Sequence, residues 1–302
     1  MMFLLKLLAR LPLPVLHALG IALGWLIYWT PGRHSARMRN NLLGSGLCTP
    51  GADCRRLLRQ AISESGKSIV ELLAVWLRPY ESVLKLVKGT TGWERIDAEL
   101  AAGRGAILVG PHIGCFEILN LHYAARHPVT VMYKPPRKAV LAKLMLDGRQ
   151  RGQATLVPTD LSGVRAQLAA LKRHEAIGTL PDQVASSGDG VWAPFFGRPA
   201  YTPTLAASLQ RKTGAAVFFI AAERLSWGRG YHLYAFPFDD PLPADKTAAA
   251  IRINQGVEAV VRRFPAQYMW SYNRYKRPHG APDPEGAPGH PAAPDPDAPP
   301  AA

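Results

Sequence analysis

The residues with the clearest chemical potential are a histidine and a glutamate five positions apart, His112 and Glu117. Five residues of continuous helix would turn the two side chains about 140° away from each other. They can meet if His112 lies in a loop and Glu117 lies in the first turn of a helix, where its carboxylate would accept the imidazole Nδ1–H. Nε2 would then be free to take a proton from a substrate hydroxyl. The spacing therefore predicts two catalytic residues: His112 as a general base and Glu117 as its orienting carboxylate.

The flanking sequence matters, because a histidine and a glutamate at this spacing are also common in purely structural contexts. The apolar run 106–109 is typical of a short buried strand, which Gly110 and Pro111 end. Gly114 breaks the turn, and a helix is expected from Phe116. The end of a strand is where α/β folds place their chemistry, so the context favours the catalytic interpretation.

Beyond this motif, patterns typical of strands alternate with patterns typical of helices. Strands are expected at 129–133, 155–158, 176–180, 215–222 and 231–238, and helices at 139–151, 161–171, 201–212 and 244–264. Strands joined by helices of this length favour an α/β fold with a mostly parallel central sheet flanked by helices. An earlier amphipathic helix over 53–77 carries basic residues, and it either packs on the core or rests against anionic lipid.

Polar side chains follow several of these strands, at what would be one edge of the sheet. Besides His112 and Glu117, we expect seven residues to bind substrate there: Lys134, Arg137, Arg149, Asp182, Gln183, Phe195 and Phe196. Cations gathered at strand ends favour an anionic substrate over a merely solvated surface. No second histidine stands at metal-ligand spacing from His112, so no metal is expected.

The composition narrows the class of partner. The 302 residues carry 36 Lys and Arg against 22 Asp and Glu, a formal net charge of +14, which predicts anionic partners such as phospholipids, phosphorylated glycolipids or an acidic carrier protein. Nucleic acid would suit the charge, but no recognisable nucleic-acid-binding module is present. The cysteines Cys48, Cys54 and Cys115 form neither a disulfide framework nor a metal pattern. They are expected to be thiols of a protein that faces a reducing cytoplasm.

The two ends of the chain differ from the domain between them, 31–277. Residues 11–30 lack Asp, Glu, Lys and Arg and end in aromatic residues that resemble an interfacial belt. We interpret residues 1–30 as a membrane anchor that spans the bilayer or lies in its interface, and a buried core helix is the alternative. Residues 278–302 carry nine prolines and are expected to form a disordered Pro/Ala-rich tail.

Seven short sequence blocks follow one another in order over roughly residues 10–277, and together they are typical of a known family. They are the N-terminal apolar segment, Arg-Asn-Asn-Leu at 39–42, His112 with Glu117, Tyr-Lys-Pro at 133–135, Pro-Asp-Gln at 181–183, Phe-Phe-Gly at 195–197 with Pro199 and Thr202, and Trp-Ser-Tyr-Asn-Arg-Tyr-Lys at 270–276. In these blocks the chain resembles the bacterial lipid A biosynthesis acyltransferases, the lauroyl and myristoyl transferases of the lysophospholipid acyltransferase superfamily.

This resemblance implies a fold similar to that of the glycerolphosphate acyltransferases, with an N-terminal membrane-anchor helix and no cofactor. It implies transfer of a fatty acyl chain from acyl carrier protein to a hydroxyl of a phosphorylated glycolipid, a lipid A precursor in lipopolysaccharide biosynthesis. The partners would be acyl carrier protein, this glycolipid and the lipids of the inner membrane. The enzyme would work at the cytoplasmic face of that membrane.

The resemblance also suggests roles for the candidate residues. Lys134 or Arg137 would bind the acceptor phosphate or stabilise the oxyanion formed at the thioester, for which the backbone N–H groups of Gly114 and Cys115 are an alternative. Many family members have Arg at the position of Lys134. Lysine lacks the bidentate fork of arginine, which shifts this task toward Arg137 and leaves the identity of the acceptor open.

Other roles stay open as well. Asp182 would orient a cation or the acceptor, or only cap a turn, and Phe195 and Phe196 would line an acyl groove or only pack against the sheet. Cys115 lies inside the motif, but the family transfers the acyl chain directly, which argues against a covalent intermediate on its sulfur.

Three other functions compete with this one. A related acyltransferase could use another acceptor, such as a mannosylated phosphoinositide, an ornithine lipid or a lysophospholipid. A non-catalytic lipid-binding protein at the membrane would make the His112 motif structural. A hydrolase is disfavoured because the chain lacks a G-x-S-x-G nucleophile elbow.

Overall fold

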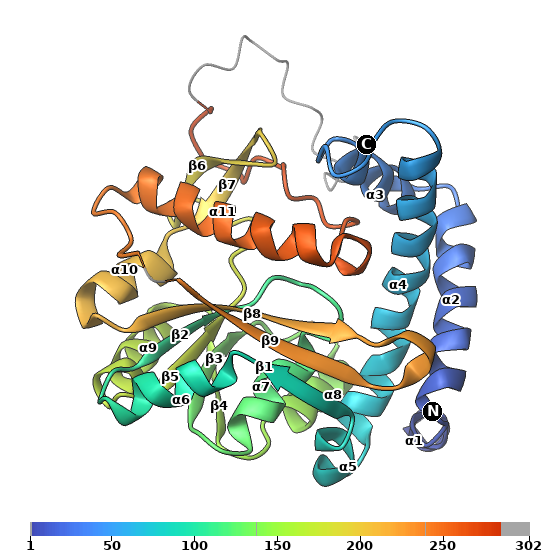
Figure 1. The fold of residues 1–302 in the computed structure, drawn as a ribbon, viewed down its shortest axis with the longest axis horizontal. Helices are drawn as coiled ribbons and strands as arrows, with labels where there is room; N and C mark the ends of the chain where they lie inside the picture. The colour runs from blue at the N-terminus through green and yellow to red at the C-terminus, as the bar shows by residue number, and fades with distance from the viewer. Residues whose placement is uncertain (1, 137, 239, 285–302) are drawn as a thin grey trace.

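The structure, a computed structural model, describes residues 2–136, 138–238 and 240–284. A group of N-terminal helices precedes an α/β body (Figure 1). These helices are α1 (Met2–Ala9), α2 (Leu13–Trp29), α3 (Arg33–Leu43), α4 (Ala52–Leu77) and α5 (Tyr80–Leu84). The amphipathic helix predicted over 53–77 is confirmed as α4.

The body is built on a seven-stranded sheet with the strand order β1-β9-β8-β2-β5-β3-β4. Its strands are β1 (Val87–Thr91), β2 (Ala106–Val109), β3 (Val129–Tyr133), β4 (Ala154–Pro158), β5 (Ala176–Thr179), β8 (Ala216–Arg224) and β9 (Tyr231–Phe238). The strands from β8 to β4 run parallel, whereas β9 is antiparallel to β8 and pairs in parallel with β1. The prediction of a mostly parallel α/β sheet is confirmed.

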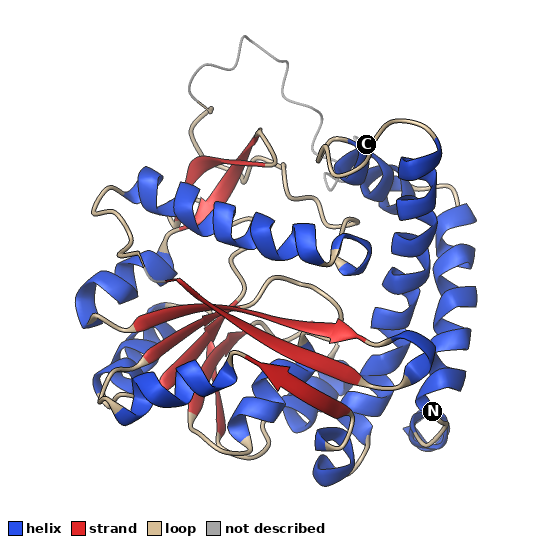
Figure 2. Cartoon of the chain, viewed as in Figure 1, coloured by secondary structure: helices blue, strands red, loops and turns tan. Residues whose placement is uncertain are grey.

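Helices cover both faces of this sheet (Figures 1 and 2). One face carries α6 (Trp93–Ala101), α7 (Glu117–Ala124) and α8 (Ala139–Arg149), and the other carries α9 (Leu161–Lys172), α10 (Leu205–Thr213) and α11 (Lys246–Arg263). Side chains of the central strand β2 alternate between two cores: Ile107 and Val109 enter one, and Ala106 and Leu108 enter the other. Because both faces are buried, the strand reads as a continuous apolar run.

Residues 1–30 form α1 and α2, and α2 lies alongside α4 (Figure 1). The two helices approach closely because Gly20, Gly24 and Gly66 face each other. A Cβ added to Gly66 would lie 1.9 Å from the carbonyl oxygen of Gly20. Leu16 and His17 lie on the inner face of α2 and are buried, whereas the residues on its outer face are largely exposed. The apolar N-terminal segment is thus helical and packs on the body along one side.

The membrane part of the anchor prediction stays a prediction. Among the described residues, no single helix is long and apolar enough to cross a bilayer, while α2 and α3 together, bent by 98°, meet the criteria of length and composition.

The structure differs from the local predictions in three places. Residues 190–203, for which no strand was predicted, form a hairpin of β6 (Gly190–Phe195) and β7 (Arg198–Pro203). Its pairing extends to Gly190 and Pro203, so the helix predicted to start at residue 201 begins only at Leu205. Strand β1 was not predicted, because its sequence Val-Lys-Gly-Thr-Thr has little apolar periodicity. The strand forms by pairing with β9, which lies far away in the sequence.

The prediction that all cysteines are thiols is wrong for two of them. Cys48 and Cys54 form a disulfide across the turn between α3 and α4, with their Cα atoms 5.0 Å apart. The turn brings the two side chains together, and their sequence separation of 6 gave no sign of this. Cys115 is a free, buried thiol.

The tail predicted to be disordered begins at residue 278, but its first part is packed against the body. Ala281 is buried, and the indole N–H of Trp192 in β6 donates a hydrogen bond of 2.7 Å to the carbonyl oxygen of Pro282. Residues 285–302 lie outside the described residues.

Candidate active site

His112 lies just beyond β2, and its partner is Asp182 rather than Glu117. Nδ1 of His112 is 2.9 Å from Oδ1 of Asp182, and the backbone N–H of His112 donates to Oδ2 at 2.9 Å. The expectation that Glu117 accepts the imidazole proton is therefore wrong. The reason is the sheet order: β5 pairs with β2, so the chain that leaves β5 brings Asp182 beside the residues that follow β2.

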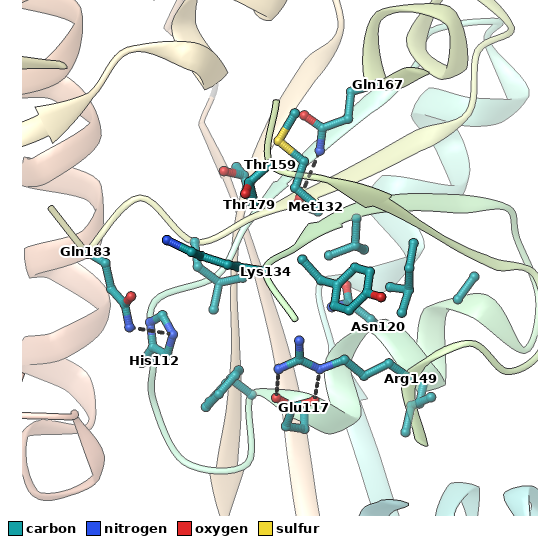
Figure 3. Close-up of a pocket in the computed structure, with 18 residues that line it drawn as sticks. His112, Glu117, Asn120, Met132, Lys134, Arg149, Thr159, Gln167, Thr179 and Gln183 are labelled. Carbon is teal, nitrogen blue, oxygen red and sulfur yellow. Dashed lines mark hydrogen bonds and ion pairs between the residues drawn. The ribbon is translucent and has the colours of Figure 1, made fainter. Parts of the chain in front are cut away.

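Gln183 contacts the other ring nitrogen of His112. Its Nε2 lies 3.1 Å from Nε2 of the histidine (Figure 3). Because Asp182 is an acceptor, the Nδ1 atom of His112 carries the proton and Nε2 presents a lone pair, which the amide of Gln183 can meet as a donor. This tautomer, assigned from the hydrogen-bond network, is the one that a general base requires.

Glu117 instead belongs to an ion pair across the cavity. Its carboxylate accepts from Nε of Arg149 at 2.8 Å and from NH2 of the same guanidinium (Figure 3). It also accepts from the indole N–H of Trp76 at 3.1 Å. Glu117 opens α7, so its side chain faces α4 and α8, which carry Trp76 and Arg149. Two expected site residues thus meet each other instead of the histidine.

The loop that follows His112 is held on both sides by backbone hydrogen bonds. The N–H of Met269 donates to the carbonyl of His112 at 3.1 Å, and the N–H of Gly114 donates to the carbonyl of Gln267 at 3.0 Å. The N–H of Cys115 donates to the carbonyl of Ala222 at 3.2 Å. The expectation that the N–H groups of Gly114 and Cys115 stabilise an oxyanion is therefore not met, because both already have acceptors.

Gly114 is required at its position in this loop. Its φ of +54° lies in the left-handed region, and a Cβ would lie 1.9 Å from the carbonyl oxygen of Ala222. The glycine lets the loop pass close to β8, which fixes the place of His112 relative to the sheet.

A cavity of about 340 Å³ opens beside His112 at the carboxyl edge of the sheet (Figure 3). Its wall is apolar at Phe116, Leu121, Val131 and Leu156. Polar and charged lining residues are His112, Glu117, Asn120, Tyr133, Lys134, Arg149, Thr159, Gln167, Thr179 and Gln183. Of the expected substrate-binding residues, Lys134, Arg149 and Gln183 line this cavity.

The remaining expected residues have other positions. Asp182 lies behind His112 as its hydrogen-bond acceptor. Phe195 and Phe196 do not line the cavity but lie in the core formed with α11, where both are buried. The expectation of an apolar groove built from these two rings is wrong, because the hairpin turns them inward. Arg137 lies outside the described residues.

Asp182 is buried, and yet it is held in its ionised form. Burial alone opposes ionisation, but the positive charge that His112 carries when protonated, the hydrogen bonds from its ring and backbone, and the charge of Arg274 lower the pKa of Asp182 below its ordinary value of 3.8. Arg274 is itself enclosed and donates to the carbonyl of Tyr201 at 2.9 Å and to Oγ1 of Thr202 at 2.7 Å. An ionised carboxylate beside Nδ1 can stabilise the imidazolium that forms when the base takes up a proton.

Cys115 is unsuited to be a nucleophile. Its side chain is buried, and burial raises the pKa of its thiol well above the ordinary value. The reactive form of cysteine is the thiolate, so this sulfur stays protonated and inert beneath the loop.

Sequence comparison covers nearly all of this chain. A family model described as bacterial lipid A biosynthesis acyltransferase matches residues 1–277, which include α1 and α2. A lipid A biosynthesis lauroyltransferase of Escherichia coli (strain K12) is 28% identical over 282 residues, 91% of this chain and 90% of the relative. A lipid A biosynthesis palmitoleoyltransferase of the same strain is 28% identical over 278 residues, 90% of this chain and 88% of the relative. A phosphatidylinositol mannoside acyltransferase of Mycobacterium tuberculosis (strain ATCC 25618 / H37Rv) is 28% identical over 181 residues, 59% of this chain and 56% of the relative.

Proposed function

Because the chain belongs to the bacterial lipid A biosynthesis acyltransferases, we propose that it moves a fatty acyl chain from acyl carrier protein to a hydroxyl group of a lipid A precursor. The observation that carries this proposal is the pair of His112 and Asp182 at a cavity with apolar walls and cationic side chains. An apolar wall suits a fatty acyl chain, and cations suit a phosphorylated acceptor.

In the proposed reaction, Nε2 of His112 takes the proton of the acceptor hydroxyl while its oxygen attacks the thioester carbonyl. The tetrahedral intermediate then collapses to the new ester, and the carbon–sulfur bond to the carrier breaks. The proton on Nε2 passes to the departing thiolate, so the histidine returns to its starting form. Asp182 stabilises the transient imidazolium and holds the tautomer throughout.

Gln183 and Lys134 suggest where the substrates sit. The amide of Gln183 occupies the lone-pair direction of His112 Nε2, which is where the acceptor hydroxyl must arrive. Lys134 lines the same cavity, and its ammonium group forms no ion pair with any described residue, whereas Arg149 is engaged by Glu117. We propose that Lys134 binds the acceptor phosphate or stabilises the developing oxyanion. Arg149 is a second cation in the cavity, less available because Glu117 pairs with it.

The proposed acceptor is a membrane lipid, and α1 and α2 offer a surface that suits a bilayer at the cytoplasmic face of the inner membrane. Their outer faces expose a set of large apolar side chains: Leu4, Leu7, Val15, Leu19, Leu26 and Trp29. Lys6 on α1, Arg10 just after α1, and Arg33 and Arg39 on α3 flank α2 in the sequence, and such cations favour anionic lipid.

A vesicle-binding assay tests this membrane contact. We expect Leu26→Glu to weaken flotation with phosphatidylglycerol-containing vesicles by about tenfold or more, since burying a leucine contributes about 1.5–3 kcal/mol. Leu161→Glu is the matched control, because Leu161 is 74% exposed on α9, outside this face. Equal binding by wild type and both variants would contradict the proposed contact.

The reaction is tested with purified protein in detergent, acyl-loaded carrier protein and a phosphorylated lipid A precursor, followed by the mass of the acceptor. Wild type should add one acyl mass, and His112→Ala should not. His279→Ala removes an exposed histidine in the C-terminal segment and should behave like wild type. Thioester consumption without acceptor acylation would retain the base and point to another acceptor, such as a mannosylated phosphoinositide. The absence of both activities in wild type would contradict the proposal.

A further inference from the structure

We propose that Asn120 and Gly178 set the longest acyl chain that this enzyme accepts, by closing the inner end of the cavity beside His112. The inference rests on the proposed acyl transfer, because it places the donor's acyl chain in this cavity. It concerns the selectivity for acyl chains of different length, which none of the residues discussed so far explains.

The first observation is a gap between two strands. The pairing of β3 with β5 ends at Val131 and Gly178, whereas β3 continues to pair with β4 as far as Tyr133. Past this point β3 and β5 diverge, and the cavity opens between them, lined by residues of both strands. Gly178 therefore stands where the gap between the strands begins.

The second observation is that two carboxamides meet at Gly178 from opposite faces of the sheet. Asn120 comes from α7, and a Cβ added to Gly178 would lie only 2.9 Å from its Oδ1 atom. Gln167 comes from α9 and is buried, and its Nε2 donates to the carbonyl oxygen of Gly178 at 3.3 Å. Gln167 thus fixes the strand from one side while Asn120 fills the space that the missing side chain leaves on the other.

The third observation is what lies behind Asn120. A small void of about 10 Å³ is lined by Asn120, Gly178 and apolar side chains that include Leu108, Leu119 and Ile220. Phe116, Asn120, Gly178, Thr179 and Leu180 line both this void and the larger cavity. The carboxamide of Asn120 therefore stands between the cavity and an apolar region that would suit more hydrocarbon.

A hydrocarbon chain should stop at such a group. The side-chain amide of Asn120 makes no hydrogen bond with the rest of the described chain, so it relies on water that enters the cavity. Pressing a methyl group against it would remove that water without a replacement, and a buried amide without a partner is costly. The chain end should therefore lie against Leu121, Val131 and Leu156 and not pass Asn120.

The test compares donors of increasing length, the even-numbered acyl chains from octanoyl to palmitoyl on carrier protein, with wild type and three variants. Wild type should show an abrupt upper limit, with kcat/KM falling by at least roughly 10–200-fold for the first donor beyond it. This is the range expected for one methylene too many in a tight pocket, and each donor in the series adds two. Asn120→Ala should move this limit to longer chains, because it opens the route to the apolar void. Gly178→Ala should move it to shorter chains, because its Cβ pushes Asn120 into the cavity.

Gln210→Ala on α10 is the matched control and should keep the wild-type limit, since Gln210 lies outside both cavities. Thermal melts check that each variant is folded, and Asn120→Ser replaces Asn120→Ala if the latter is not. Folded, active variants at both positions that keep the wild-type limit would overturn the chain-length proposal alone. A wild type that transfers no acyl chain of any length would overturn the proposed function and this inference with it.

Discussion

Asp182 and Glu71 are buried carboxylates that each pair with a basic side chain, and they differ in the side chain that they face. Asp182 faces His112, whose side chain is 13% exposed and opens to a cavity. Glu71 faces Arg224, and both of these side chains are 1% exposed. A histidine can take up and release a proton near neutral pH, whereas an arginine stays charged. The open, titratable pair is therefore suited to chemistry, and the enclosed pair is suited to holding elements together.

The enclosed pair joins segments that are far apart in sequence. Nε of Arg224 in β8 donates to Oε2 of Glu71 in α4 at 2.9 Å, and the hydroxyl of Tyr231 in β9 donates to the same oxygen at 2.9 Å. Nε2 of His17 in α2 lies 3.5 Å from it. The cluster thus ties the N-terminal helices to the antiparallel pair of strands, directly beneath the loop that carries Cys115 and His112.

The largest expected effect comes from removing the charge at the open pair. Asp182→Asn should lower kcat by about 10²–10⁴-fold, the usual contribution of general base catalysis, because an amide neither fixes the tautomer nor stabilises the imidazolium. The melting temperature should change little. Initial rates of acyl transfer and a thermal melt measure both quantities, and a rate near that of wild type would remove Asp182 from the mechanism.

The enclosed pair should show the opposite pattern, a loss of stability. Glu71→Ala leaves Arg224 with less compensation in the interior and should lower the free energy of unfolding by about 3–5 kcal/mol. Arg56→Ala is the control, because Arg56 is 75% exposed in its pair with Asp53 and should contribute less than about 1 kcal/mol. Urea unfolding measures the change, and equal effects of the two variants would contradict the distinction between enclosed and exposed pairs.

The same pair predicts a loss of stability in acid. Burial alone would raise the pKa of Glu71, but the charge and hydrogen bonds of Arg224 lower it from 4.5 to about 2. A carboxylate with a lowered pKa contributes stability that is present above its unfolded value and is lost as pH falls through its folded value. Unfolding of wild type should therefore become easier as pH falls from about 4.5 to about 2. Melts of Glu71→Gln should depend less on pH in this window, and parallel curves would rule out Glu71 as the source.

The smallest expected effect is that of Glu117→Gln. It exchanges the ion pair with Arg149 for a hydrogen bond between a neutral amide and the charged guanidinium. We expect a loss of roughly 1.4 kcal/mol, or about tenfold in rate, because Glu117 acts on the cavity wall and not on His112. Parallel rate measurements with Asp182→Asn decide the point. A loss as large as that of Asp182→Asn would return Glu117 to a direct part in proton transfer.

Much of the fold could be predicted because its signals are local. The continuous apolar run of β2 arises because both of its faces are buried, and the periodicity of α4 arises because only one of its faces is buried. Both patterns are visible in the sequence itself. The hairpin of β6 and β7 and the short strand β1 were missed, since their pairing depends on partners and not on their own composition. The disulfide between Cys48 and Cys54 depends on a turn that the presence of two cysteines does not by itself predict.

For the active site, the sequence by itself determined that His112 stands at the end of a buried strand, that Lys134, Arg149 and Gln183 follow neighbouring segments, and that the chain resembles an acyltransferase family. Only the tertiary structure decided the partner of the histidine. Spacing favoured Glu117, which is five residues away, but Glu117 points to Trp76 and Arg149 on other helices. Asp182 is seventy residues away and reaches His112 because β5 lies next to β2 in the sheet. Strand order follows from the packing of whole elements, which no local pattern of residues records.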